Sequence, residues 1–331
     1  MVTILDSKNT KIEIGVIGAG SISSVVHLPL LSCIDHVSIK FIADTFDPKE
    51  LAKTYNTQSI KITDITSLPN CDIAVLAIPV GVRKKYIQEF SKRKTAIFTE
   101  KPFAIDPETH KSFLELSNRI SCNYMRIYYN STRQIKNIIT SGIFGPIKKV
   151  SITEGGIIGK TGRGKDSYQA NPKLSGGGLL METGCHTLSQ LDFLFDDISV
   201  RESKVIWQDD FDIDAQIVFD ISGSNSFSID YHITMIKPIE TLTTLFFEHF
   251  QLSFNHLVPN AVFTISNYNS DKQFTLCQEN KFAATFAQAY YLKWKSFLDQ
   301  IRQGNTIDTK LETSFKTTQM ISEIIQKGTP A

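Results

Sequence analysis

The order of elements at the start of the chain restricts the fold more than any other feature. A short apolar run over residues 12–17 is followed by two glycines, Gly18 and Gly20, and then by a helix-like segment that runs to about Cys33. Glycines in such a turn let it close, and they let backbone N–H groups at the helix N-terminus reach a phosphate. The pattern predicts a dinucleotide site. The expected contacts are Gly18, Gly20, Ser21 and Ile22.

Ser23 stands where the usual fingerprint has its third glycine, so a tight turn without a ligand is the alternative interpretation. The position of one acidic residue, Asp44, favours the interpretation as a dinucleotide site. Asp44 follows a predicted strand over residues 37–43 and lies 24 residues after Gly20. This is close to the offset of about 20 at which an acid binds the adenosine ribose.

A carboxylate at that place accepts hydrogen bonds from both ribose hydroxyls and repels a 2′-phosphate. We therefore expect NAD as the cofactor, while Lys49 and Lys53 nearby leave NADP open. A helix cap or a turn is the alternative role for Asp44.

Strands and helices go on alternating up to about residue 128, which predicts a parallel, doubly wound sheet with its ligand beyond the carboxyl ends of the strands. Four residues at such ends are expected to contact the cofactor: Ile78, Pro79, Glu100 and Lys101. The remaining strands are predicted over residues 59–62, 72–78, 95–98 and 121–128, and the helices over residues 48–55, 82–91 and 107–120.

The pattern then changes to apolar and polar residues in alternation, which is typical of strands with one buried face. Strands are predicted over residues 147–153, 200–207, 215–220, 226–234, 242–247 and 250–254, and amphipathic helices over residues 282–302 and 310–326. We infer an α/β Rossmann domain over residues 1–126, with residues 1–10 as a loose extension. An α+β domain with a large, mainly antiparallel sheet follows over residues 127–331.

The segment from Gly176 to His186 places two proton-handling groups, Glu182 and His186, four residues apart. On a helix this spacing brings them to one face. The glycines at its start let the backbone approach something closely. A hydrogen-bonded structural pair is the alternative to a catalytic one. A zinc site is a further alternative, but it requires a third ligand, and the sequence has neither an H-E-x-x-H motif nor a cysteine pair. No metal is expected.

Charge and cysteines indicate the class of partner and the compartment. The 331 residues carry a formal charge of +1, which gives no field for attracting nucleic acid or an anionic membrane, so we expect a small-molecule partner. The five cysteines are scattered and form no C-x-x-C pair, which favours a reducing compartment, the cytoplasm. The polar N-terminus predicts no signal peptide, and no apolar run of about 18 residues predicts a membrane span.

Taken in order, the glycine turn, Asp44, Glu100-Lys101-Pro102 and the helix with His186 make the chain resemble the Gfo/Idh/MocA oxidoreductases. Further matching pieces are His27-Leu-Pro-Leu, Tyr124-Met-Arg-Ile-Tyr128, Ser141-Gly-Ile-Phe-Gly145 and Trp294-Lys-Ser-Phe-Leu. The resemblance implies an NAD(P)-dependent dehydrogenase that acts on sugars, inositols or nucleotide-linked sugars. It also implies that the sheet of the second domain is open-faced and forms a homo-dimer or homo-tetramer.

The resemblance suggests roles for the catalytic residues. His186 would take the hydroxyl proton as the base, Lys101 would orient the hydroxyl and stabilise its developing charge, and Glu182 would fix His186 or a neighbouring hydroxyl. Tyr128 and Arg163 are expected to bind the substrate. The family usually has Asp where this chain has Glu182, so a non-catalytic sensor of NAD(H) or of a nucleotide sugar is the alternative. A methyltransferase would share the glycine turn but leave Lys101 unexplained.

Overall fold

The structure is a computed structural model that describes residues 11–156, 167–223, 225–269, 273–276, 282–304 and 307–330. Its contacts divide the chain into two compact units. The first unit comprises residues 1–104, 108–123 and 293–313, and the second comprises residues 105–107, 124–292 and 314–331. A boundary at residue 126 was expected from the sequence. In the structure the chain enters the second unit at Tyr124, and Lys293–Thr313 return to the first.

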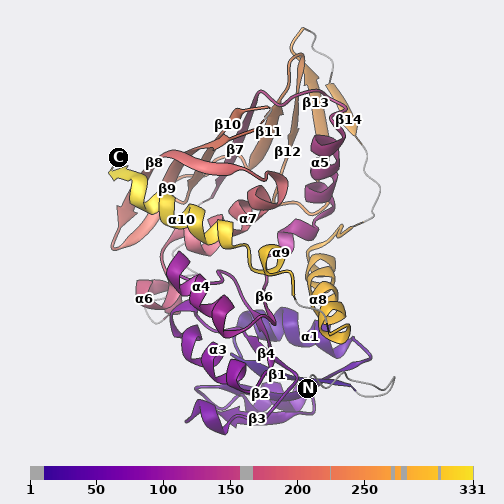
Figure 1. The fold of residues 1–331 in the computed structure, drawn as a ribbon, viewed down its shortest axis with the longest axis vertical. Helices are drawn as coiled ribbons and strands as arrows, with labels where there is room; N and C mark the ends of the chain where they lie inside the picture. Colours follow the sequence, from indigo (N-terminus) through magenta and orange to yellow (C-terminus); the bar gives the residue numbers. More distant parts are fainter. Residues whose placement is uncertain are drawn as a thin grey trace. The chain divides into compact units, whose positions relative to one another are not determined.

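The first unit contains a parallel sheet of six strands in the order β3-β2-β1-β4-β5-β6 (Figure 1). This confirms the predicted Rossmann architecture, in which the order reverses between β1 and β4. The strands are β1 (Ile12–Ile17), β2 (Val37–Asp44), β3 (Gln58–Lys61), β4 (Ile73–Leu76), β5 (Ala96–Thr99) and β6 (Ile120–Cys122). The helices are α1 (Leu28–Ser32), α2 (Lys49–Thr54), α3 (Arg83–Lys92) and α4 (Pro107–Leu116).

A helix from the end of the chain completes the core of this unit. Helix α8 (Phe286–Arg302) contributes Trp294 and Phe297 to a buried cluster that also holds Val16 and Phe98. The ring of Trp294 stacks on that of Phe98, with 4.0 Å between the ring centroids. The short helix α9 (Thr309–Thr313) follows α8 in the same unit.

Two predicted elements in this region were wrong in extent. The helix expected over residues 107–120 ends at Leu116, and the strand expected over residues 121–128 is only the three-residue β6. Strand pairing stops where the neighbouring β5 stops, because Thr99 pairs with Cys122. The apolar residues beyond form a buried 3₁₀ turn (Met125–Tyr128) instead. A short apolar run does not distinguish these two outcomes.

The second unit contains nine described strands in one sheet, in the order β14-β13-β12-β11-β7-β10-β9-β8-β15 (Figure 1). Only the pairs β7–β10 and β8–β15 are parallel, so the prediction of a mainly antiparallel sheet is confirmed. The strands are β7 (Lys149–Gly155), β8 (Ile198–Gln208), β9 (Phe211–Ile221), β10 (Phe227–Thr234), β11 (Leu242–Phe246), β12 (Phe250–Phe254), β13 (Phe263–Asn267), β14 (Gln273–Leu276) and β15 (Gly328–Pro330).

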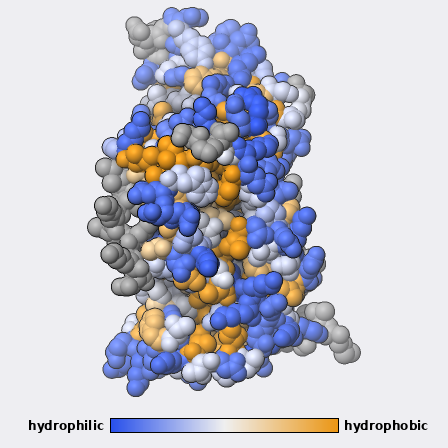
Figure 2. Space-filling model, turned by 90° about the vertical axis from the view of Figure 1, so that its left-hand side faces the viewer, coloured by the Kyte–Doolittle hydropathy of each residue, from blue (hydrophilic) through white to orange (hydrophobic). Residues whose placement is uncertain are grey.

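Helices α5 (Asn130–Ser141) and α7 (Cys185–Leu194) lie against one face of this sheet. Along β7, Val150, Ile152 and Glu154 are buried on that face. The opposite face is polar and carries exposed ion pairs, such as Lys149 with Asp230. In the space-filling view, hydrophilic residues separate the hydrophobic ones into patches (Figure 2).

The single helix predicted over residues 310–326 is interrupted. Ser314, whose φ is +49°, separates α9 from α10 (Phe315–Lys327). A residue in the left-handed conformation does not continue a helix. The Ser314 hydroxyl donates a hydrogen bond to the carboxylate of Asp192 at 2.7 Å. Strands β13, β14 and β15 were not predicted. Within the described ranges, no helix is long and apolar enough to cross a membrane.

Candidate active site

The glycine turn after β1 has the geometry of a phosphate site. Gly18 has a φ of +98°, and a Cβ atom there would lie 2.3 Å from the backbone oxygen of Ala77. Only glycine fits such a position. A Cβ on Gly20 would meet no atom within 4 Å, so the backbone faces open space there. No side chain caps the helix that follows. These features fit a dinucleotide, whose phosphates approach such a turn closely.

Ser23, in place of the third glycine, holds the turn in shape. Its hydroxyl donates to the carbonyl oxygen of Gly18 at 2.5 Å. The helix is π-helical over Ser23–His27, and single π turns are frequent at functional sites. The serine therefore replaces a packing glycine with a hydrogen bond.

Asp44 joins the end of β2 to the glycine turn. Its Oδ2 accepts from the backbone N–H of Ala19 at 2.6 Å, and its Oδ1 accepts from the backbone N–H of Thr45, also at 2.6 Å. Oδ1 also accepts from the Thr45 hydroxyl at 3.1 Å, whereas Oδ2 keeps a second lone pair. Asp44 can therefore stabilise the turn and still accept a hydrogen bond from a ribose hydroxyl. Its part in the choice of cofactor stays a prediction.

Glu100 is the centre of a buried hydrogen-bond network at the end of β5. Its Oε1 is 2.8 Å from Nε2 of His27 and accepts from Nδ2 of Asn123 at 2.7 Å. Its Oε2 accepts from the backbone N–H of Lys101 at 3.2 Å. Burial raises the pKa of Glu100, but His27 and the positive charge of Lys101 outweigh burial and keep this pKa below its usual value. An ionised carboxylate thus holds the backbone at Lys101.

Arg83 ties together the two strand ends expected at the cofactor. It is 1% exposed, and its guanidinium donates to the carbonyl oxygens of Ile78, Pro102 and Phe103. The peptide bond between Lys101 and Pro102 is cis. One buried side chain therefore fixes the loop after β4 relative to the loop after β5.

The segment that carries Glu182 and His186 begins as a π-helix over Leu180–Gly184 and continues as α7. The expectation of a regular α-helical face is thus corrected, because a π turn places residues four apart at a different angle. Glu182 Oε1 accepts from Nε2 of Gln169 at 2.6 Å. His186 is 7% exposed.

The glycines before this segment approach the protein's own chain. The buried carboxylate of Asp212 accepts from the backbone N–H groups of Gly178 and Leu180 at 2.7 and 2.6 Å. A Cβ on Gly178 would lie 2.3 Å from the backbone oxygen of Asp212. The close approach expected from the glycines is therefore made by the start of β9, which supplies the missing helix cap.

A second buried carboxylate, Glu154, lies beside α7. Its Oε2 accepts from the hydroxyls of Thr187 and Tyr231 at 2.6 and 3.0 Å, and it lies 3.4 Å from Nε2 of His256. Burial raises the pKa of Glu154, but His256, Arg126 and Thr187 together lower it below its usual value. Within the described residues its Oε1 has no hydrogen-bond partner and lies 3.9 Å from Nη1 of Arg126.

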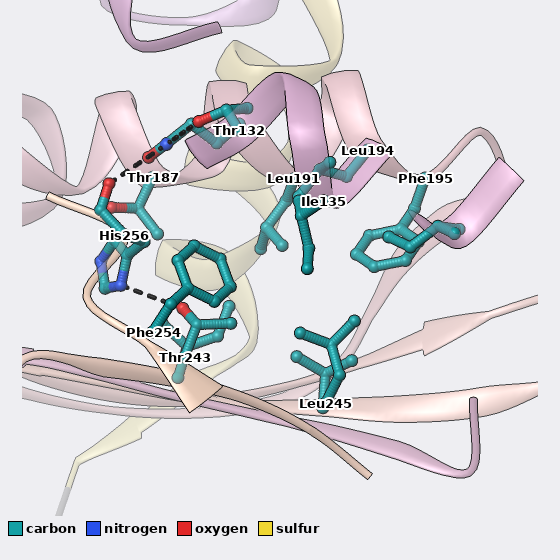
Figure 3. A pocket seen from close by; sticks show the side chains of 14 residues that line it. Thr132, Ile135, Thr187, Leu191, Leu194, Phe195, Thr243, Leu245, Phe254 and His256 are labelled. Atoms are coloured by element: carbon teal, nitrogen blue, oxygen red, sulfur yellow. Dashed lines mark hydrogen bonds between the residues drawn. The ribbon is translucent and has the colours of Figure 1, made fainter. Parts of the chain in front are cut away.

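A small cavity lies near this network, between α5, α7 and the sheet (Figure 3). Its volume of about 20 Å³ has room for about one water molecule. Ile135, Leu191, Leu245 and Phe254 line it, and His256 stands at one side with Nδ1 3.0 Å from the hydroxyl of Thr243. The cavity is a gap in an apolar core rather than a ligand site.

Comparison with known families agrees with this geometry. The model of an oxidoreductase family with an NAD-binding Rossmann fold matches residues 12–128, and that of the GFO/IDH/MocA C-terminal domain matches residues 132–239. The chain belongs to the Gfo/Idh/MocA family.

Two curated proteins similar to this chain are named inositol dehydrogenases. Inositol 2-dehydrogenase of Rhizobium meliloti (strain 1021) is 24% identical over 148 residues, which cover 43% of this chain and 44% of that protein. The NADP(+)-dependent scyllo-inositol 2-dehydrogenase IolW of Bacillus subtilis (strain 168) is 22% identical over 206 residues, which cover 59% and 55%. The chain thus spans about half the length of the curated relatives that it matches.

Solved structures share the fold over nearly the whole chain. KijD10, a 3-ketoreductase from Actinomadura kijaniata in complex with NADP and TDP-benzene, has a TM-score of 0.82 at 13% identity, covering 97% of this chain and 99% of that one. Levoglucosan dehydrogenase in complex with NADH and levoglucosan has a TM-score of 0.79 at 13% identity, covering 96% and 97%.

Of the two residues expected to bind the substrate, the structure describes only Tyr128. Tyr128 is 8% exposed, its carbonyl oxygen accepts from the N–H of Ala283 at 3.1 Å, and the guanidinium of Arg133 lies 5.1 Å from its ring centroid. Arg163 lies outside the described residues. Among the described residues, no three His, Cys, Asp or Glu side chains are grouped as metal ligands would be.

Four functional candidates, Arg83, Arg126, Glu154 and Asp212, were not found from the sequence. For two of them, the sequence pattern contains an indication that could have been used. Arg83 shares the stripe of buried positions on α3 with Tyr86, Ile87 and Phe90, and Glu154 occupies a buried position in the alternation of β7. A charged residue at an apolar position of a regular pattern is therefore worth treating as a candidate in this family.

Proposed function

We propose that this protein is an NAD(P)-dependent dehydrogenase that transfers hydride between a nicotinamide and a secondary alcohol or ketone of a sugar, inositol or nucleotide-linked sugar. The observation that carries the proposal is the buried Glu100 carboxylate, which accepts from the backbone N–H of Lys101 at the carboxyl end of β5. The named substrates of the relatives, inositols and levoglucosan, support the substrate class.

The side chains divide the chemistry between them. A bound nicotinamide supplies the hydride acceptor or donor. Lys101 orients the substrate oxygen and stabilises its negative charge, and His186 takes its proton in oxidation or returns it in reduction. Glu182 fixes the histidine or a neighbouring hydroxyl. Arg126 binds a substrate hydroxyl, because its Nε and Nη1 are buried without a hydrogen-bond partner among the described residues.

The test is the replacement of Lys101 by Ala, followed by nicotinamide absorbance over a panel of inositols, sugars and nucleotide-linked sugars. Turnover should fall by about a hundredfold or more, because one donor to a developing oxyanion is lost. NAD affinity should stay within about threefold, since Lys101 acts mainly in the transition state. Lys101→Arg should not restore turnover. Lys92→Ala is the matched control, since that side chain is 76% exposed. Undiminished turnover in the Lys101→Ala variant would exclude the assigned role.

The base can be tested separately. If His186 takes the proton, the rate of oxidation should rise with pH through one histidine-like ionisation, because only neutral imidazole accepts a proton. His186→Asn should remove this rise together with most of the activity. An unchanged pH profile in that variant would assign the base elsewhere.

A non-catalytic sensor of NAD(H) or a nucleotide sugar is the second candidate. The longer Glu182, whose Oε1 is already bound by Gln169, favours it. Tight cofactor binding by the parent protein without any nicotinamide oxidation or reduction over the whole panel would support the sensor.

We further propose NAD over NADP, a homo-oligomer built on the polar face of the nine-stranded sheet, and the cytoplasm as compartment. Asp44 supports NAD, since its carboxylate repels a 2′-phosphate. Calorimetric titration with both dinucleotides tests the preference, and equal affinities would remove Asp44 from this role. Sedimentation of the parent and of Lys149→Glu, which reverses one charge on the sheet face, tests the assembly.

A further inference from the structure

A line of hydrogen bonds runs from helix α8 to Lys101. It begins at Trp294, which is fully buried and separated from its partner His27 by 267 positions in the sequence. The indole N–H is a donor only. It points at Nδ1 of His27 over 3.2 Å, so this ring nitrogen must be the acceptor and carries no proton.

The position of the His27 proton follows from this contact. A neutral imidazole with a bare Nδ1 carries its proton on Nε2. Nε2 lies 2.8 Å from Oε1 of Glu100, so His27 donates to the carboxylate. The other tautomer would place an N–H against the indole N–H and a bare nitrogen against the carboxylate oxygen. The ionised carboxylate of Glu100 can only accept, so it requires the same tautomer, and Trp294 supports that tautomer by keeping a proton off Nδ1.

The remaining hydrogen bonds of the network connect Glu100 to Asn123 and to the backbone of Lys101. Glu100 Oε1 also accepts from Asn123, and its Oε2 accepts from the backbone N–H of Lys101. His27 and Asn123 are 0% exposed, so water does not compete for their hydrogen bonds to Glu100. In so buried a network each hydrogen bond strengthens the next.

We propose that Trp294 and His27 are positioning residues of the reaction: the indole holds the histidine ring in place and keeps its Nδ1 unprotonated, the histidine holds Glu100, and Glu100 holds the backbone of Lys101. The inference rests on the proposed function, in which Lys101 acts on the substrate oxygen. Neither Trp294 nor His27 needs to touch the substrate. Helix α8 thereby sets the geometry of a residue at the end of β5.

Trp294→Phe separates the N–H from the packing, because the phenyl ring can keep the stack on Phe98. It should lower kcat by about tenfold or more, since displacements near 1 Å at a reacting group cost up to about a hundredfold, with NAD affinity within about twofold. Phe297→Leu is the matched control. It alters the same helix and the same aromatic cluster, and no hydrogen bond is lost. Its kcat should stay within about twofold of the parent value.

His27 gives a second pair of variants. His27→Gln keeps an amide donor for Glu100 and an oxygen acceptor for Trp294, so it should retain most of kcat. His27→Leu keeps neither, so its kcat should fall as far as in Trp294→Phe. A role in packing alone predicts the reverse, because leucine fills a buried site without burying a polar group.

Nitrogen-15 NMR of histidine-labelled protein reads the tautomer without any turnover. In the parent, Nδ1 of His27 should be unprotonated and Nε2 protonated, with the resonances assigned by their loss in His27→Gln. In Trp294→Phe, Nδ1 loses the donor that keeps it unprotonated, so a population with Nδ1 protonated should appear, and the amide resonance of Lys101 should shift. A protonated Nδ1 in the parent overturns the inference.

The kinetic outcomes distinguish the proposed positioning role of Trp294 and His27 from the proposed function. Parental kcat in both Trp294→Phe and His27→Leu, with Lys101→Ala inactive, overturns the positioning role and leaves the proposed function standing. Parental turnover in Lys101→Ala overturns the proposed role of Lys101 instead. An equal loss of kcat in Phe297→Leu and Trp294→Phe assigns the effect to packing and also overturns the inference.

Discussion

Each unit buries one glutamate beside a proposed catalytic residue, and the two glutamates differ in how completely their oxygens are bonded. Glu100, in the first unit, uses both carboxylate oxygens and precedes Lys101 in the chain. Glu154, in the second unit, takes all its hydrogen bonds on Oε2, one of them from Thr187, the residue after His186. Its Oε1 has no hydrogen-bond partner among the described residues.

The difference indicates two uses of a buried carboxylate. A fully bonded group is held in one place, so Glu100 suits the positioning of a backbone. A buried oxygen without a partner is costly, and in native proteins it usually has a water molecule or a ligand to meet. Glu154 Oε1 and the guanidinium of Arg126, 3.9 Å apart, are therefore the part of the second unit that we expect to meet substrate or bound water.

The largest expected effect is on stability and compares Glu100→Gln with Glu154→Gln. An amide has only one accepting oxygen, so Glu100→Gln must leave one of its three donors facing an NH₂ group. This should lower the free energy of unfolding by about 3 kcal/mol. In Glu154→Gln, the amide oxygen can face every donor that Oε2 now serves, so the loss should be about 1 kcal/mol.

Urea unfolding of the parent and the two variants measures both losses, and the circular dichroism of each variant before unfolding is the control for folding. Equal losses, or a greater loss in Glu154→Gln, would mean that the number of bonded oxygens does not distinguish the two sites.

How far the sequence predicts each site depends on how far apart in the chain its partners lie. Glu100-Lys101-Pro102 is contiguous and stands at a strand end, so its place in the site is predictable. The hydrogen bond of Trp294 to His27 is not, because periodicity describes neighbours along one element, whereas 267 positions separate these two residues. The same holds for Thr187, Tyr231 and His256, which meet Glu154 from three separate segments.

The fold was more predictable than the site because its signals are repeated. The alternation of strands and helices recurs through the first unit, so an error such as the over-long strand at 121–128 leaves the architecture intact. The π turn at Leu180–Gly184 is one local event without a repeating pattern. The glycines before it indicated that the backbone approaches another group closely, but they did not identify that group. It is Asp212, which lies more than 30 residues further along the chain.

An intermediate effect is expected in acid. Both Glu100 and Glu154 have pKa values below the ordinary 4.5, so between that value and the folded-state pKa the unfolded chain binds protons that the folded protein does not. The free energy of unfolding should therefore fall as pH decreases below about 4.5, by at most about 1.4 kcal/mol per pH unit for each group.

Either Gln variant should reduce this slope, because each removes one such group. Urea titrations at a series of pH values from neutral down to the acid limit of folding measure the slope. A slope in Glu154→Gln equal to that of the parent would mean that the pKa of Glu154 in the folded protein is not below that in the unfolded chain.

The smallest expected effect distinguishes two hydroxyl groups that donate to the same carboxylate oxygen. Thr187 and Tyr231 both donate to Glu154 Oε2, at 2.6 and 3.0 Å. Thr187→Val and Tyr231→Phe each remove the donor and keep the shape of the side chain, so each should lower the free energy of unfolding by about 1 kcal/mol. They should differ in kinetics. Thr187 follows His186 directly on α7, so its loss should reduce kcat several-fold, whereas Tyr231→Phe should leave kcat within about twofold of the parent value. Steady-state kinetics beside urea unfolding decides the matter: an equal fall in kcat would mean that Glu154 itself takes part in the chemistry, and no fall in either would limit its network to holding the fold.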